Sequence, residues 1–327
     1  MEKVSVLVAV HNAEKTIRRC IDSLLCQTIG DVQIICVDDA STDASLTILN
    51  DYAAQHSCVT VIALSENRGQ AHARNQGIPL IKAPFTAFLD SDDYMAPDAL
   101  EKARKTFEED EDTDCVLLNV RYIYPDGREH GYRTPPFEQM TGYDAFIKSL
   151  NWDVHGWYVA RTELYRRFPF DETCHSYSDD NITMAHYLHS RMVRCCDGKY
   201  FFTQHDDSCT HQATIRRFDW LKANMSMHRQ LVKWGMKRDV IDIYERHRWF
   251  VLMDCYWFYY KHRNHFSPQD QTKALHIMHE AWKDIDTSTC LPWRIKYKPG
   301  YMPMKWSWTL FRWQEEILSF TRKIRKL

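Results

Sequence analysis

The segment Asp90-Ser91-Asp92-Asp93 carries the strongest chemical signal in this chain of 327 residues. It follows an apolar run, Phe85 to Leu89, that is typical of a buried strand. An Asp-x-Asp pair in an extended segment points two carboxylates to the same side, and proteins bind Mg²⁺ or Mn²⁺ through one or two carboxylates together with phosphate oxygens. The sequence therefore predicts a metal site at Asp92 and Asp90, where the ion would act as a Lewis acid on a diphosphate.

A helix cap is the structural alternative for the same residues. Pro97 suits the first turn of a helix, and the spacing predicts that helix from Asp98 to about Glu109. The residues Asp90 to Asp92 could cap it, because Asp and Ser are favoured at the N-cap. Asp93 is a third carboxylate, and the sequence leaves it without an assigned role.

Short apolar runs indicate which elements must position these side chains. Helix-period segments, such as the one with Ile17, Ile21 and Leu24, alternate with the runs, and this alternation predicts a doubly wound α/β sheet. The runs that we expect to form buried strands are Val4 to Val10, Val32 to Val37, Val59 to Leu64, Phe85 to Leu89 and Cys115 to Val120.

Polar residues directly follow four of these runs, at the position where open α/β sheets bind their ligands. If the strands are parallel neighbours, these groups converge on one edge of the sheet. They are His11-Asn12, Asp38-Asp39, Glu66-Asn67-Arg68 and Asp90 to Asp93. Ser41 or Thr42 is expected to cap the helix after the second run, which leaves Asp39 to accept a hydrogen bond from a nucleobase.

The order of these motifs resembles that of family 2 glycosyltransferases, which have the GT-A fold. The resemblance covers about residues 1 to 210, and Asp179-Asp180-Asn181 extends it beyond four motifs in the first 93 residues. Those four are VSVLVAVHN (4–12), VDDASTD (37–43), NRG (67–69) with ARNQG (73–77), and FLDSDD (88–93).

The resemblance implies roles for the matching residues. For Arg74, a salt bridge to a neighbouring strand end is the alternative to recognition of a phosphate or base. Asp180 would be the general base, with Asp179 beside it, although both could instead stabilise a helix N-terminus. The donor-binding set that the resemblance implies is Ala9, His11, Asn12, Asp39, Arg74, Asp90 and Ser91, with Asp92 and Asp90 at the metal.

Two further residues are candidates on weaker grounds. Trp157 would suit stacking on an acceptor sugar, and packing in the core is its alternative. His205 would approach the donor phosphates or the metal, and a loop histidine that faces solvent is its alternative.

The C-terminal third of the chain differs in composition from the rest. From about Phe218, Trp, Tyr, His and Arg recur with helical spacing, so we expect a GT-A catalytic domain over residues 1–215 and a helical region over 216–327. Residues 294–327 hold nine Lys or Arg and two Glu, a net charge of +7. The total of −2 therefore leaves −9 for residues 1–293.

The final helix is predicted to be amphipathic. Tryptophans with basic flanks suit peripheral contact of residues 305–327 with an anionic membrane, and packing onto the catalytic domain or a second subunit is the alternative. The apolar positions, spaced by four and three, are Trp306, Leu310, Trp313, Ile317, Phe320, Ile324 and Leu327.

The sequence also indicates a compartment. No run of eighteen apolar residues and no signal-peptide pattern occurs, and eleven scattered cysteines fit reduced thiols. We expect a cytoplasmic protein, for which the inner face of the membrane is one location, and no nucleic-acid partner.

Together these features predict an inverting, metal-dependent transfer of a hexosyl or hexosaminyl group from a nucleotide sugar, of the UDP type, to a saccharide or lipid-linked acceptor. The resemblance implies a place in bacterial surface polysaccharide biosynthesis. A sugar-nucleotide nucleotidyltransferase is one alternative, but it would want a glycine-rich loop where His11 to Lys15 stands. A nucleotide- or glycan-binding protein without catalysis is another. No Gly-x-Gly-x-x-Gly follows a strand run, which disfavours a nicotinamide enzyme.

Overall fold

The computed structural model describes residues 3–131, 137–173, 177–204, 214–289 and 305–324. The chain forms two compact units. One comprises Met1–Glu172 with Ile182–Thr210, and the other comprises Thr173–Asn181 with His211–Leu327. The second unit thus takes in residues 173–181, which the sequence analysis assigns to the first domain.

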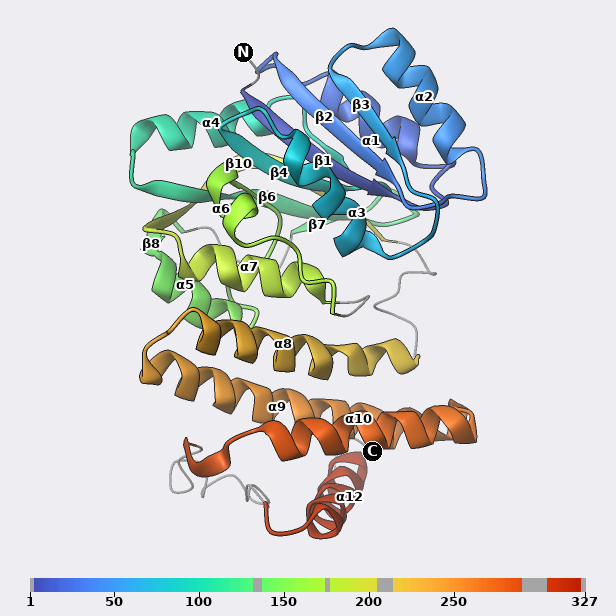
Figure 1. Ribbon diagram of the computed structural model, residues 1–327, viewed down its shortest axis with the longest axis vertical. Helices are drawn as coiled ribbons and strands as arrows, with labels where there is room; N and C mark the ends of the chain where they lie inside the picture. The colour runs from blue at the N-terminus through green and yellow to red at the C-terminus, as the bar shows by residue number, and fades with distance from the viewer. Residues whose placement is uncertain (1–2, 132–136, 174–176, 205–213, 290–304, 325–327) are drawn as a thin grey trace. The chain divides into compact units, whose positions relative to one another are not determined.

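The first unit is built on a sheet of ten strands (Figure 1). Its main path runs β3-β2-β1-β4-β9-β6-β10-β5, with β7 paired to β6 and β8 paired to β10. The strands are β1 (Val4–Val10), β2 (Val32–Asp38), β3 (Val59–Ala63), β4 (Phe85–Asp90), β5 (Tyr94–Met95), β6 (Thr113–Ile123), β7 (Glu129–Gly131), β8 (Gln139–Thr141), β9 (Tyr158–Arg161) and β10 (Met192–Thr203). Every predicted strand run is a strand.

Strand direction confirms the predicted mixed, doubly wound sheet. The strands β3, β2, β1 and β4 are parallel neighbours. Beyond them, β9 is antiparallel to both β4 and β6, and β10 is parallel to β6. The four strand ends that carry the polar motifs therefore lie along one edge.

The helices of the first unit connect these strands. Among them, α3 lies against the parallel strands, and a Cβ at Gly77 would come within 2.8 Å of Leu7 Cδ2, so a larger residue there would require the Leu7 side chain to move. The helices are α1 (Ile17–Leu25), α2 (Ser45–Gln55), α3 (Gln70–Gly77), α4 (Ala99–Glu109), α5 (Gly142–Ser149), α6 (Thr162–Arg167) and α7 (Ser178–Leu188), and the division between the units falls within α7.

The expected helix cap at Ser41 or Thr42 is wrong, and so is the alternative in which Asp90 to Asp92 form a cap. Asp43, rather than Ser41 or Thr42, accepts the Ser45 N–H at the start of α2, at 2.9 Å. Ser41 and Thr42 instead bond to Asn12, because the loops after β1 and β2 lie side by side. The segment Asp90 to Asp92 does not cap α4 either, since β5 intervenes and Asp98 occupies the N-cap.

The second unit is helical, as predicted for the C-terminal region. Its long helices are α8 (Asp219–Lys233), α9 (Arg238–His262), α10 (Pro268–Asp284) and α12 (Trp308–Ile324). Their shared core contains Trp249 and Tyr256 from α9, Met278 from α10 and Phe311 from α12. Within the described residues, no helix has the length and apolar character that a membrane span requires.

The helix α12 buries a carboxyl group in this core. Its buried residues are Phe311, Glu315 and Ser319, and burial raises the pKa of Glu315 to about 7. A carboxyl whose pKa is higher in the folded state than in the unfolded state favours folding at low pH. That contribution is lost as the pH rises through the folded pKa.

We predict that Glu315→Gln raises the melting temperature at pH 8, because it removes a carboxylate that is charged and buried there. The gain should shrink toward pH 5, where Glu315 is protonated in the wild type. Thermal unfolding at pH 5, 6.5 and 8 measures it. The matched control is Glu316→Gln, which removes the partner of Arg263 and should destabilise the protein. A Glu315→Gln effect that is the same at all three pH values would contradict the prediction.

Candidate active site

The register of the parallel strands brings the predicted residues to one edge of the sheet. Val10 pairs with Asp38, and Ala9 pairs with both Val37 and Asp90. Ala9 and Asp90 therefore share a face of the sheet, because cross-strand partners point to the same side. Leu7, two residues before Ala9, touches α3, which identifies this face as the one that α3 covers.

Asp39 holds the loop that follows β3. It is 2% exposed, and its two carboxylate oxygens accept hydrogen bonds from the backbone N–H of Arg68 (2.9 Å) and of Gly69 (2.7 Å). Gly69 has a φ of +93°, a conformation that favours glycine. Two of the sequence motifs, the one with Asp39 and the one with Arg68, are thus joined by direct hydrogen bonds.

His11 and Asn12 are exposed and line the same edge. His11 Nδ1 lies 2.9 Å from the Asp39 carbonyl oxygen, so a proton on Nδ1 would complete a hydrogen bond. Asn12 has a φ of +51°, and its side-chain oxygen accepts from the Thr42 N–H at 2.8 Å. Asn12 therefore connects the loops after β1 and β2, and the His11 ring lies at the rim.

The carboxylate of Asp90, at the end of β4, accepts hydrogen bonds from three side chains. Gln70 Nε2 donates at 2.7 Å, Trp157 Nε1 donates at 3.3 Å, and Arg74 Nη2 forms an ion pair. The negative charge of Asp90 is thus balanced by the guanidinium of Arg74 within the protein itself.

Arg74 forms the salt bridge to a neighbouring strand end that the sequence offered as its alternative role. The side chain is 1% exposed, and its guanidinium lies 4.4 Å from the ring centre of Phe88 and 5.0 Å from that of Phe170. Its Nε and Nη1 have no acceptor among the described residues. In this arrangement Arg74 acts on the site through Asp90.

Asp93 is buried and anchors the acidic turn to β10. Its carboxylate accepts from the Tyr200 hydroxyl and from the Thr203 N–H, both at 2.7 Å. Burial raises the pKa of Asp93 well above its ordinary value, and the nearby charges of Asp90 and Asp92 raise it further. The structure therefore gives Asp93 a positioning role that the sequence did not assign.

Ser91 and Asp92 are half-buried, whereas Asp93 in the same turn is buried. The guanidinium of Arg19, from α1, donates to the Asp92 carbonyl oxygen at 2.7 Å and to Thr203 Oγ1 at 2.9 Å. The turn is thus held from the backbone side, and the Asp92 side chain is only partly covered.

The weaker candidates have different outcomes. Trp157 is buried and stacks on Tyr200 with ring centres 4.5 Å apart, which is the core packing that the sequence offered as its alternative. His205 lies outside the described residues.

Asp179 and Asp180 occupy the first turn of α7, in the segment that belongs to the second unit. There Asn181 Nδ2 donates to the Ala223 carbonyl oxygen at 2.9 Å.

The sequence matches the model of glycosyl transferase family 2 over residues 5–173, which is just over half of the chain. The chain belongs to glycosyltransferase family 2. This confirms the predicted family, and the crystal structure of TarS from S. aureus, residues 1–349 in complex with UDP-GlcNAc, supports the GT-A fold. It aligns with a TM-score of 0.68 and 21% identity over 88% of this chain and 82% of that TarS fragment.

Relatives of this family 2 protein match parts of their own length. EpsH of Bacillus subtilis is 42% identical over 166 residues, which cover 50% of this chain and 47% of EpsH. The chondroitin synthase of Pasteurella multocida is 35% identical over 138 residues, 42% of this chain and 14% of the synthase. The chain thus spans about half or less of these relatives.

Three positioning residues of this family 2 protein escaped the sequence analysis. Gln70 contacts Asp90 from α3, Arg19 holds the acidic turn from α1, and the Tyr200 hydroxyl bonds Asp93 from β10. No local pattern marks them, because each partner lies between 20 and 107 positions away in the sequence.

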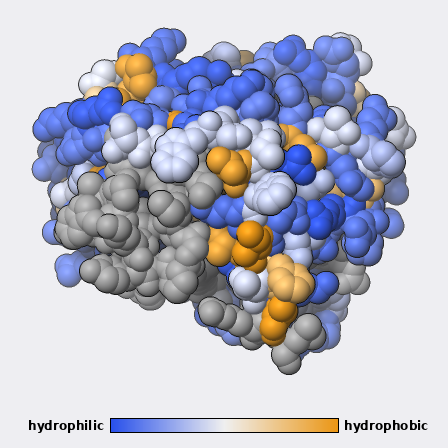
Figure 2. All heavy atoms as spheres, turned by 90° about the horizontal axis from the view of Figure 1, so that it is seen from below, coloured by the Kyte–Doolittle hydropathy of each residue, from blue (hydrophilic) through white to orange (hydrophobic). Residues whose placement is uncertain are grey.

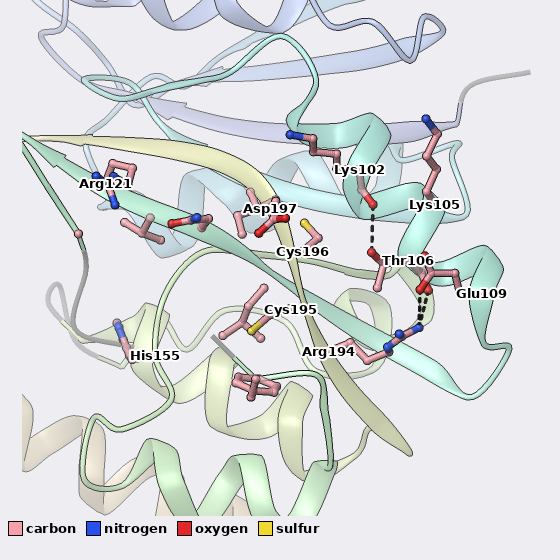
Figure 3. Close-up of a pocket in the computed structure, with 16 residues that line it drawn as sticks. Lys102, Lys105, Thr106, Glu109, Arg121, His155, Arg194, Cys195, Cys196 and Asp197 are labelled. Carbon is pink, nitrogen blue, oxygen red and sulfur yellow. Dashed lines mark hydrogen bonds and ion pairs between the residues drawn. The ribbon is translucent and has the colours of Figure 1, made fainter. Parts of the chain in front are cut away.

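A separate cavity of about 560 Å³ lies between α4, β6 and β10 and contains none of the predicted site residues (Figure 3). Four cations line it, and each has a carboxylate partner. The ion pairs are Lys102 with Asp98, Lys105 with Glu101, Arg121 with Glu129, and Arg194 with Glu109. The cavity therefore offers little uncompensated charge to a ligand.

We predict that Arg74→Met and Asp90→Asn each destabilise the protein by about 3 kcal/mol, because each removes one charge of the ion pair between the buried Arg74 and Asp90, which is only 20% exposed. In the double variant, the second substitution should lower the free energy of unfolding by about 1–3 kcal/mol less than it does alone. Chemical denaturation of the four proteins measures the cycle. The control Arg68→Met, at an exposed position, should change stability by about 0.5 kcal/mol or less. Additive effects would show that the ion pair is not the interaction that matters.

Proposed function

We propose that this family 2 protein is an inverting glycosyltransferase. In this proposal it moves a hexosyl or hexosaminyl group from a UDP-sugar to a saccharide or lipid-linked acceptor, in bacterial surface polysaccharide biosynthesis and at the inner face of the membrane. The observation that carries the proposal is the meeting of Asp39, Asp90 and Asp92 at the carboxyl edge of parallel strands. Such an edge is where α/β sheets bind nucleotides.

The nucleobase would lie beside Asp39, between Ala9 and the His11 ring. Each carboxylate oxygen of Asp39 accepts one backbone N–H and keeps a second lone pair for a base N–H. Ala9 has a small side chain on the face that it shares with Asp90. Asp90 and Ser91 would then meet the ribose and phosphates, with Arg74 holding Asp90 in place.

The residues present fit Mn²⁺ or Mg²⁺. Asp92 and Asp90 supply hard oxygen ligands in one turn, and these ions typically complete their coordination with phosphate and water oxygens. Across the described ranges, no three His, Cys, Asp or Glu side chains group as a metal site, so an ion bound here would need ligands from the substrate and water as well. When bound, the ion would stabilise the charge of the departing diphosphate.

Asp180 would act as the general base. Its carboxylate would take the proton of the acceptor hydroxyl while that oxygen bonds to the anomeric carbon. The bond from this carbon to the diphosphate oxygen breaks, its electron pair leaves with UDP, and the anomeric configuration inverts. Asp180 lies in the first turn of α7 and matches the position that the resemblance to the family gives to the base.

Similar proteins support the substrate class. One relative is a chondroitin synthase, and the TarS crystal structure contains UDP-GlcNAc. A saccharide acceptor and a UDP-sugar donor are therefore the first pair to test.

We predict that Asp180→Asn lowers turnover by about 10²- to 10⁴-fold, because the amide cannot accept the proton. UDP binding should be unchanged. The measurement is UDP release with a panel of UDP-sugars and acceptors, alongside UDP titration calorimetry. The control Asp179→Asn should retain turnover. Full turnover in Asp180→Asn would remove this residue as the base, and wild-type UDP binding without any turnover would indicate a binding protein.

We predict that Asp92→Asn weakens UDP binding in the presence of Mn²⁺ and has little effect in EDTA, because it removes a ligand that acts only through the metal. Chelation should lower the wild type to the level of the variant. Calorimetry with and without Mn²⁺ tests this. UDP affinity that is independent of Mn²⁺ in the wild type would rule out a metal between the protein and the diphosphate.

A further inference from the structure

The helix α12 docks on its own unit with the face that the hydrophobic pattern did not predict. Its buried residues are Phe311, Glu315 and Ser319, at positions i, i+4 and i+8. An α-helix turns by about 100° per residue, so the predicted apolar stripe lies on the opposite side. The stripe is therefore left outside the core of the second unit.

The stripe is exposed along the length of the helix. Its side chains are between 47% and 85% exposed, and they are Trp306, Leu310, Trp313, Ile317, Phe320 and Ile324. Figure 2 views the molecule from the side on which α12 is drawn in Figure 1, and shows hydrophobic side chains gathered on a largely hydrophilic face. A contiguous apolar patch of this kind marks an interaction surface.

Cations lie at the C-terminal end of the stripe. Arg322 and Lys323, in the last turn of α12, are exposed. Arg322 also lies over the ring of Trp257 on α9, 5.9 Å from its centre, and Lys261 lies 6.0 Å from the same ring. The carboxylates of α12 do not offset this charge at the surface, because Glu315 is buried and Glu316 is paired with Arg263.

We propose that this face of α12 binds the surface of an anionic membrane, with the stripe in the interfacial layer and the cations against lipid phosphates. Exposed tryptophans on an apolar face with Lys and Arg beside it suit the membrane interface. The net charge of +7 over residues 294–327 is complementary to anionic lipid. A second copy is a poorer occupant, because residues 294–327 of both copies carry the same net charge of +7 and would repel each other.

Vesicle binding tests the proposal without donor or acceptor. The protein should co-sediment with vesicles of phosphatidylcholine and phosphatidylglycerol, with a blue shift in tryptophan fluorescence. It should bind pure phosphatidylcholine more weakly, and added NaCl should weaken the anionic binding. Trp313→Ser with Ile317→Ser should reduce binding about tenfold or more, because two apolar side chains no longer enter the interface.

Control variants separate the hydrophobic contribution to vesicle binding from the electrostatic one. Val232→Ser removes an equally exposed apolar side chain from α8 and should leave binding unchanged. Arg322→Gln with Lys323→Gln should weaken binding to the anionic vesicles and leave any binding to the neutral ones as it was. Asp180→Asn should bind vesicles like the wild type, so a failure of the proposed catalysis would leave this result unaffected.

Other outcomes would overturn the proposal. One is a failure of the wild type to bind anionic vesicles. Another is a dimer, detected by light scattering, that the Trp313→Ser and Ile317→Ser variant converts to monomer while vesicle binding is absent. That result would assign the face to a second copy of the chain. Circular dichroism of each variant verifies that α12 remains helical.

Discussion

The strand-end site depends on the paired carboxylate of Asp90. A charge that is largely removed from water is costly unless a counter-charge and hydrogen bonds balance it, and Asp90, which is 20% exposed, has three such donors. They come from α3, through Gln70 and Arg74, and from Trp157 just before β9. One carboxylate thus fixes α3 and the approach to β9 against the end of β4. These contacts also help to position the loops that line the site.

Asp90, Asp92 and Asp93 have different roles in the turn after β4 because their surroundings differ. Asp90 pairs with a cation, whereas Asp93 accepts hydrogen bonds from neutral donors on β10, and burial together with the charges of Asp90 and Asp92 raises the pKa of Asp93. Asp92 keeps a partly accessible side chain, while Arg19 holds its carbonyl oxygen. Two of the carboxylates therefore position the turn. The third is the one best placed to meet a ligand.

The second unit shows that an amphipathic pattern identifies a helix without identifying the face that packs. The helix α12 contributes Phe311 to the core, together with two polar residues, Glu315 and Ser319. Burial of Glu315 raises its pKa to about 7 and opposes folding at higher pH. Exposure of the apolar stripe and burial of a carboxyl both depart from what local hydrophobicity favours. Such departures are expected where a surface serves a function beyond folding.

The sequence by itself determined the strands, the edge where their polar ends meet, and the family. These features follow from local patterns, because a continuous apolar run must be buried and parallel neighbours end on the same side. Tertiary structure alone decided that Arg74 pairs with Asp90, that Ser41 bonds to Asn12 rather than capping α2, and which face of α12 packs. The bond between Tyr200 and Asp93 spans 107 residues of sequence. Hydrophobic periodicity indicates which residues avoid water, but a polar partner so distant in the sequence is set only when the chain packs.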